Sequence, residues 1–125
     1  MGLTFLKIAV VYLFVGAALG LGMGIAQNFA LVPVHTHLLL LGWASLALAG
    51  LVYHLYPAAA ATRLARVHFW LHNLGLPAFM LTLGLYLLGG APLVPVVAVT
   101  AIVVLVGLGV FAVNVLINVR AASQP

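Results

Sequence analysis

The stretch PVHTHLLLLGWASLALAGLVYHLYP, from Pro33 to Pro57, is the clearest indication of the fold of this chain. The residues between the two prolines are mostly apolar and include no Asp, Glu, Lys or Arg. A membrane-spanning α-helix needs about 20 mostly apolar residues, and proline is common at helix ends because it cannot donate a main-chain hydrogen bond. The stretch therefore predicts a membrane helix from Val34 to Tyr56.

The composition of the whole chain indicates the same environment. Of its 125 residues, 67% are hydrophobic and 3% are charged, whereas a soluble domain has about 45–50% apolar and about 25% charged residues. We therefore expect an integral membrane protein surrounded by a lipid bilayer. The basic residues are too scattered for a nucleic-acid surface. The lack of cysteine excludes disulfides, thiolate metal sites and c-type haem attachment.

Three further segments have the length and composition of membrane helices. We therefore predict an all-α membrane protein, with a single four-helix transmembrane bundle over residues 1–125. The first segment is expected to be a retained helix, because a cleaved signal peptide has a shorter apolar core. The predicted helices are Leu3–Ala26, Val34–Tyr56, Val67–Leu88 and Val94–Val119.

The positive charges predict the orientation of the bundle. With four spans, the N-terminus, the second loop and the C-terminus share one side of the membrane. Short loops rich in Lys and Arg stay in the cytoplasm, so we expect cytoplasmic termini in a multi-pass protein of the cell inner membrane. His35 and His37 would then lie near the outer surface. The basic residues at or near the cytoplasmic side are Lys7, Arg63, Arg66 and Arg120.

Three glycines form a stripe on the first predicted helix. Gly16, Gly20 and Gly24 repeat every four residues and share one face. Such a stripe of small residues lets another backbone, or a flat cofactor, approach closely. Packing of helix against helix is the commoner use of a glycine stripe, and contact with a cofactor is the alternative.

Two histidines open the second helix, one residue apart. Residues i and i+2 of an α-helix lie about 200° apart, so His35 and His37 should point to nearly opposite sides. Imidazole is a common ligand of haem iron and other transition metals. His35 and His37 are therefore our candidate metal ligands, each serving a different site. The alternative is that both rings only form hydrogen bonds near the headgroups, where water and free N–H groups are available.

Three more histidines lie further along the chain. His68 and His72 are four residues apart and share a helix face, a spacing that suits a shared metal ion. The alternative is that His68, beside Arg66, lies at the membrane interface. In an antiparallel hairpin His54 could reach the depth of His72. A second cofactor between His54 and His72 is therefore one hypothesis. The other is that these rings bond to polar partners such as Asn73 or main-chain carbonyls.

The opening stretch resembles the second helix of subunit I in haem–copper oxidases and nitric oxide reductases, particularly the cbb3-like branch. In that family a histidine followed by threonine opens the helix at its outer end and ligates low-spin haem. The helix commonly closes with a tyrosine-rich stretch and a proline. PVHT at 33–36 and YHLYP at 53–57 match these features. HTH at 35–37 is also similar to the His-x-His of the family's tenth helix, which serves two haems.

The resemblance implies that His35 and His37 bind haem b, with His35 the better match. Subunit I is built from three pseudo-repeated groups of four helices, so a four-helix relative implies a homotrimer. Each interface would hold a haem between His35 of one chain and His37 of its neighbour. A dimer, or a haem within one chain, stays open.

The chain departs from the family in several motifs. It lacks the copper ligands, the acidic proton channel and the outer arginines that hold haem propionates. Proton-pumping oxygen reduction is therefore not expected. The propionates would have to meet water, Gln27, Asn28 or main-chain N–H groups.

The predicted function is that of a membrane b-type cytochrome. It would exchange electrons with a quinone or another redox protein, or bind O₂ or NO. No catalytic residue is assigned, and whether the chain is an enzyme is left open. The alternatives are a haem-free accessory or assembly subunit and a small histidine-lined metal transporter. The lack of carboxylate and cysteine ligands disfavours the transporter.

Overall fold

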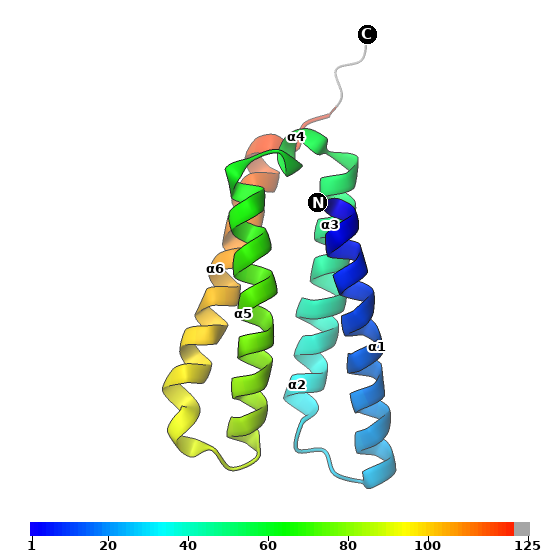
Figure 1. Ribbon diagram of the computed structural model, residues 1–125, viewed down its shortest axis with the longest axis vertical. Helices are drawn as coiled ribbons and strands as arrows, with labels where there is room; N and C mark the ends of the chain where they lie inside the picture. The colour runs from blue at the N-terminus through cyan, green and yellow to red at the C-terminus, as the bar shows by residue number, and fades with distance from the viewer. Residues whose placement is uncertain (122–125) are drawn as a thin grey trace.

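The computed structural model of the chain describes residues 1–121 as a series of helices (Figure 1). The elements are α1 (Gly2–Ala26), α2 (Val32–His37), the π-helical segment η1 (Leu38–Ala44), α3 (Ser45–Leu55), α4 (Pro57–Ala60), α5 (Arg63–Leu87), the 3₁₀ turn η2 (Ala91–Leu93) and α6 (Val94–Asn118). Helix α1 packs against the composite helix α2–η1–α3, and α5 packs against α6. The fold is therefore a pair of helical hairpins.

The short helix α4 lies between the two hairpins along the chain. We call this end of the molecule, which also holds the N-terminus, the α4 end. The turns at 27–31 and 88–90 lie at the opposite end. The ribbons of the two hairpins diverge from the α4 end toward that opposite end (Figure 1).

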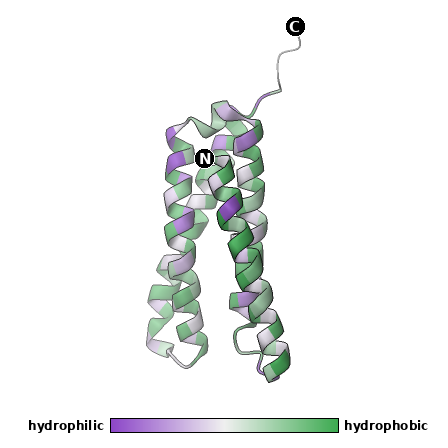
Figure 2. Ribbon diagram, turned by 45° about the vertical axis from the view of Figure 1, so that its right-hand side comes forward, coloured by the Kyte–Doolittle hydropathy of each residue, from purple (hydrophilic) through white to green (hydrophobic). Residues whose placement is uncertain are grey.

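Three helical stretches within the described residues are long and apolar enough to cross a membrane: Gly2–Ala26, Val32–Leu55 and Ala91–Asn118. They confirm the prediction of a membrane protein built from apolar helices. Helix α5 is as long as α1 and α6, at 25 residues, but its polar residues lower its hydropathy. The more hydrophilic residues are concentrated in the half of the bundle nearest the α4 end (Figure 2). The fourth span stays a prediction.

Helix α5 begins at Arg63 rather than at the predicted Val67. The Ala65 N–H donates to the Thr62 side-chain oxygen at 3.1 Å, as is usual for threonine at a helix N-cap. The apolar run alone misses this first turn because it carries Arg63 and Arg66. Helix α1, whose apolar run reaches its last turn, ends at Ala26 as predicted.

The helix predicted over Val34–Tyr56 contains the π-helical segment η1. At its end the Ser45 N–H bonds to the carbonyl of Leu40, whereas a regular α-helix would bond it to the carbonyl of Leu41. The Leu41 carbonyl instead accepts a hydrogen bond from His72 Nε2 at 2.8 Å. Single π turns are frequent at functional sites, and this one supplies α5 with a main-chain acceptor.

The hairpins share a core near the α4 end. Phe5 of α1 is fully buried, and its ring stacks on that of His68 of α5 with the centroids 5.1 Å apart. Phe5 also contacts Tyr53 of α3, at 5.4 Å. The Tyr53 ring in turn lies 5.8 Å from that of His68, so both helices of the first hairpin contact the second.

Asn114 of α6 fixes the loop that joins the hairpins. It is fully buried, and its Nδ2 donates to the Ala59 carbonyl at 3.0 Å. Its Oδ1 accepts from Thr62 Oγ1 at 3.1 Å and from Asn118 Nδ2 at 2.8 Å. One side chain therefore ties α6 to α4 and to the start of α5.

Replacing Asn114 with alanine should lower the free energy of unfolding by about 2 kcal/mol, since hydrogen bonds between membrane helices contribute about 0.6 kcal/mol each on average and three are lost. Asn118→Ala removes only one of the three, and its cost should be about a third as large. Unfolding in mixed detergent–SDS micelles measures both variants. Equal losses would contradict the role given to Asn114.

Candidate haem-binding site

The ring of His35 lies against α1. Its Nδ1 is 2.7 Å from the Gly16 carbonyl oxygen, and a carbonyl only accepts, so Nδ1 carries the proton. The ring covers Gly20, where an added methyl group would lie 2.5 Å from His35 Cε1 and 3.0 Å from Nδ1. Only a residue without a side chain leaves the ring this position.

Side chains of the second helix therefore pack against the glycine stripe. A methyl group at Gly16 would meet Leu39 Cδ2 at 2.8 Å, and one at Gly20 would meet His35. A methyl group at Gly24 would meet nothing within 4 Å. The packing interpretation of the stripe is confirmed for Gly16 and Gly20.

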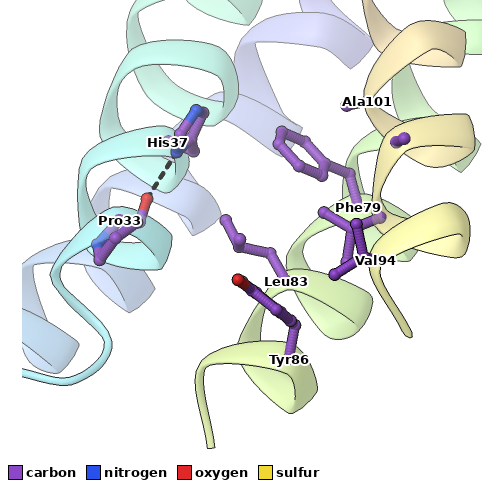
Figure 3. Close-up of a pocket in the computed structure, with 9 residues that line it drawn as sticks. Pro33, His37, Phe79, Leu83, Tyr86, Val94 and Ala101 are labelled. Carbon is purple, nitrogen blue, oxygen red and sulfur yellow. Dashed lines mark hydrogen bonds between the residues drawn. The ribbon is translucent and has the colours of Figure 1, made fainter. Parts of the chain in front are cut away.

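His37 points away from α1, toward the second hairpin (Figure 3). Its Nδ1 is 2.6 Å from the Pro33 carbonyl oxygen. Its ring meets that of Phe79 of α5 edge to face, with the centroids 5.2 Å apart. His35 and His37 therefore contact different neighbouring helices, as their spacing predicts.

Both rings have the tautomer that a metal-binding histidine needs. Each Nδ1 donates its proton to a main-chain carbonyl, so in a neutral ring Nε2 keeps its lone pair. Metal-binding histidines almost always donate the other ring N–H to a carbonyl or carboxylate, which fixes the tautomer and the ring orientation. His35 and His37 are both half-buried. Each ring could therefore ligate a transition metal through its Nε2, at a separate site.

Two apolar grooves flank His37, each with a volume of about 370 Å³. Phe79 and Ala101 line both of them. The first runs toward the end opposite α4, where Tyr86 lines it (Figure 3). The second runs toward the α4 end and includes Leu41. These volumes fall in the range of about 300–1,000 Å³ that is typical of cofactor and ligand sites.

The structure does not bring His54 to His72. His54 is exposed on α3 and lines a cavity at the α4 end, whereas His72 is fully buried on α5. Within residues 1–121, no three His, Cys, Asp or Glu side chains gather in a way that could hold a metal ion. The hypothesis of a cofactor between His54 and His72 gains no support from this geometry.

His68 and His72 instead belong to a buried hydrogen-bonded chain. Tyr53 Oη is 3.0 Å from His68 Nδ1, and His68 Nε2 is 3.2 Å from His72 Nδ1. His72 Nε2 lies 2.8 Å from the Leu41 carbonyl oxygen. The His68 ring is fully buried, and its position at the membrane interface stays a prediction. The prediction that His68 and His72 share a helix face is confirmed.

Sequence reasoning missed two residues of the buried hydrogen-bonded chain and one contact of His35. No hydrogen-bond partner was predicted for Tyr53, because its bond to His68 depends on how the hairpins meet. Leu41 takes part through its carbonyl, which no side-chain pattern reveals. The stripe did single out Gly20, but not its contact with His35.

Comparisons with protein families, curated proteins and solved structures found no match to this chain. The chemistry of the site is therefore argued from its residues. Two imidazoles with free Nε2 atoms, near one end of an apolar bundle, can ligate a transition metal or a metal-containing cofactor.

Proposed function

We propose that the chain is a membrane b-type cytochrome in which His35 and His37 bind haem b. The observation that carries the proposal is the shared state of the two rings, in which Nδ1 donates to a main-chain carbonyl and Nε2 is free. Haem ligated by two imidazoles is suited to one-electron transfer. The proposed role is electron exchange with a quinone or another redox protein. Release of one imidazole would open a site for O₂ or NO.

The proposed haem site lies between two chains. His35 and His37 face different neighbouring helices, α1 and α5. One chain therefore cannot direct both Nε2 atoms to one iron. His35 of one chain and His37 of a neighbour can approach an iron from opposite sides. Such a head-to-tail contact forms a ring where the rotation between chains closes, and the resemblance to a subunit with three four-helix repeats favours a homotrimer.

The groups that would hold the propionates are neutral. Arg63 and Arg66 start α5 at the far end of the bundle. Near the proposed site, Asn28 Oδ1 accepts from the Ala30 N–H at 3.1 Å, which leaves the Asn28 amide N–H₂ group as a donor. Gln27 Nε2 is bound to the Gly24 carbonyl at 2.7 Å. The propionates would therefore meet Asn28, main-chain N–H groups or water.

We place all four long helices across the bilayer. Helix α5 packs along α6 and has the same length, so a bilayer that covers α6 also covers α5. Lys7, Arg63 and Arg66 lie near the α4 end, which is therefore proposed to face the cytoplasm. His35 and His37 then lie toward the outer face of the cell inner membrane.

The reduced-minus-oxidised visible spectrum of the detergent-purified protein, with a haem assay on the same sample, tests the proposal. We expect sharp α and Soret bands of low-spin haem b, and one haem per chain when every interface of the ring is loaded. A protein that stays colourless after expression with added haem precursor would remove the cytochrome proposal. The haem-free accessory subunit would then become the leading function.

A further inference from the structure

The π-helical segment η1 divides the second helix of the first hairpin into two parts, and each part packs against α1 through its own contacts. On the α3 side, a methyl group added at Gly50 would lie 2.8 Å from the Gly2 carbonyl oxygen, so the two backbones are in close contact. On the α2 side, the His35 ring covers Gly20. A π turn contains one residue more than an α turn, so the rotation of α2 relative to α3 depends on η1.

A hydrogen bond from α5 satisfies the carbonyl that this π turn leaves without a main-chain partner. The Ser45 N–H bonds to the Leu40 carbonyl, which also accepts from Ser45 Oγ at 2.8 Å. The Leu41 carbonyl, which the Ser45 N–H would reach in an α-helix, accepts from His72 Nε2 at 2.8 Å. An unpaired main-chain carbonyl is costly inside a membrane. Without His72, the Leu41 carbonyl would therefore compete for the Ser45 N–H and favour a continuous α-helix.

We propose that His72 is a positioning residue for His35 and His37. Its bond to the Leu41 carbonyl stabilises the π turn, and the π turn sets the directions in which the two rings point. Loss of the π turn would rotate α2 by about 100° relative to α3. Because α3 stays packed on α1, this rotation would carry both rings away from their present contacts. The ligand role of the rings rests on the proposed function, whereas the control of α2 by His72 does not.

The alternative is that the bond between His72 and Leu41 only joins the two hairpins. His72 belongs to α5 in the second hairpin, and Leu41 belongs to the first. Loss of such a bond would weaken the docking of the hairpins but leave the first hairpin unchanged. A measurement made entirely within the first hairpin therefore separates the two roles.

A disulfide between Gly16→Cys and Leu38→Cys reports the rotation of α2 within the first hairpin. A Cβ atom at position 16 would lie 3.3 Å from Leu38 Cβ, close to the separation of about 3.5–4.5 Å in disulfides. Leu39 Cδ2, which would lie 2.8 Å from the new Cβ, is the end of a flexible side chain and can move. The natural chain has no cysteine to compete. A rotation by about 100° would turn position 38 away from α1 and prevent the bond.

The yield of this disulfide in the full-length, haem-free protein in lipid nanodiscs tests the proposal. His72→Leu should lower the yield by about tenfold, because the Leu41 carbonyl loses its donor. His68→Leu is the matched control. It removes the neighbouring buried histidine of the same hydrogen-bonded chain but keeps the bond between His72 and Leu41, so the yield should not change. An unchanged yield in His72→Leu, or an equal loss in His68→Leu, would overturn the proposal.

Deletion of Leu41 from the His72→Leu protein provides a second test, which also applies if His72→Leu alone does not fold. The deletion removes the carbonyl that has lost its donor and turns the bond between Ser45 and Leu40 into that of a regular α-helix. The α2 helix then keeps its rotation without a π turn, so the disulfide should form as in the natural background. Failure of the disulfide to return would overturn the proposal. A natural background that forms the disulfide but binds no haem would overturn the proposed function alone.

Discussion

Replacement of His35 or His37 with alanine is expected to abolish the low-spin haem spectrum, whereas His54→Ala should leave it unchanged. Each ring would supply one axial imidazole through its free Nε2. Loss of only an outer-shell partner typically costs about 10–100-fold in metal affinity, and loss of the ligand itself should cost more. His54 is the matched control because it is an exposed histidine on α3, lining the cavity at the α4 end.

Visible spectra and haem stoichiometry of the three variants check this prediction. Imidazole added to the buffer should restore part of the low-spin spectrum in His35→Ala and His37→Ala, because it fills the vacated ligand position. Restoration would separate loss of a ligand from loss of the fold. Unchanged spectra and stoichiometry in both variants would falsify the assignment of these histidines.

Co-expression of the two alanine variants tests whether the site lies between chains. A His37→Ala chain still offers His35, and a His35→Ala chain still offers His37. In a cyclic head-to-tail oligomer of randomly mixed chains, about a quarter of the interfaces would regain both ligands. If one chain supplied every ligand, mixing would restore no low-spin haem.

The sequence predicted the helices well because their signal is local. The apolar run that begins at Leu3 matches α1, and the run from Val94 matches α6. The wider turn at Leu38–Ala44 could not be predicted, since the run is apolar throughout and its π hydrogen bonds depend on tertiary contacts. An extra residue in one turn rotates everything beyond it by about 100° relative to a continuous α-helix.

The sequence spacing of His35 and His37 predicted the directions of their rings but not the atoms that the rings contact. The two-residue step from His35 to His37 determines that the rings diverge. The acceptors of their Nδ1 protons, Gly16 and Pro33, depend on where α1 packs and on how the chain enters α2. The pairing of His68 with Tyr53 spans the two hairpins, so no local pattern contains it.

The contact of the His35 ring with Gly20 orients this candidate ligand. Gly20→Ala should lower haem affinity by about 10–100-fold, the usual cost of losing an outer-shell partner. The added methyl group would lie 2.5 Å from His35 Cε1, so the ring must move and its bond to the Gly16 carbonyl must break or lengthen. The His37 ring and its bond to the Pro33 carbonyl do not contact Gly20, so this effect isolates His35.

Gly24→Ala is the matched control for this experiment. It makes the same chemical change on the same helix and the same stripe, yet its methyl group meets nothing within 4 Å. Both variants gain a similar helix propensity, about 1 kcal/mol, so a difference between them does not arise from the helix itself. Haem titration of the two purified proteins gives the comparison. If Gly20→Ala binds haem as tightly as Gly24→Ala does, then the packing of His35 against α1 has no part in haem ligation.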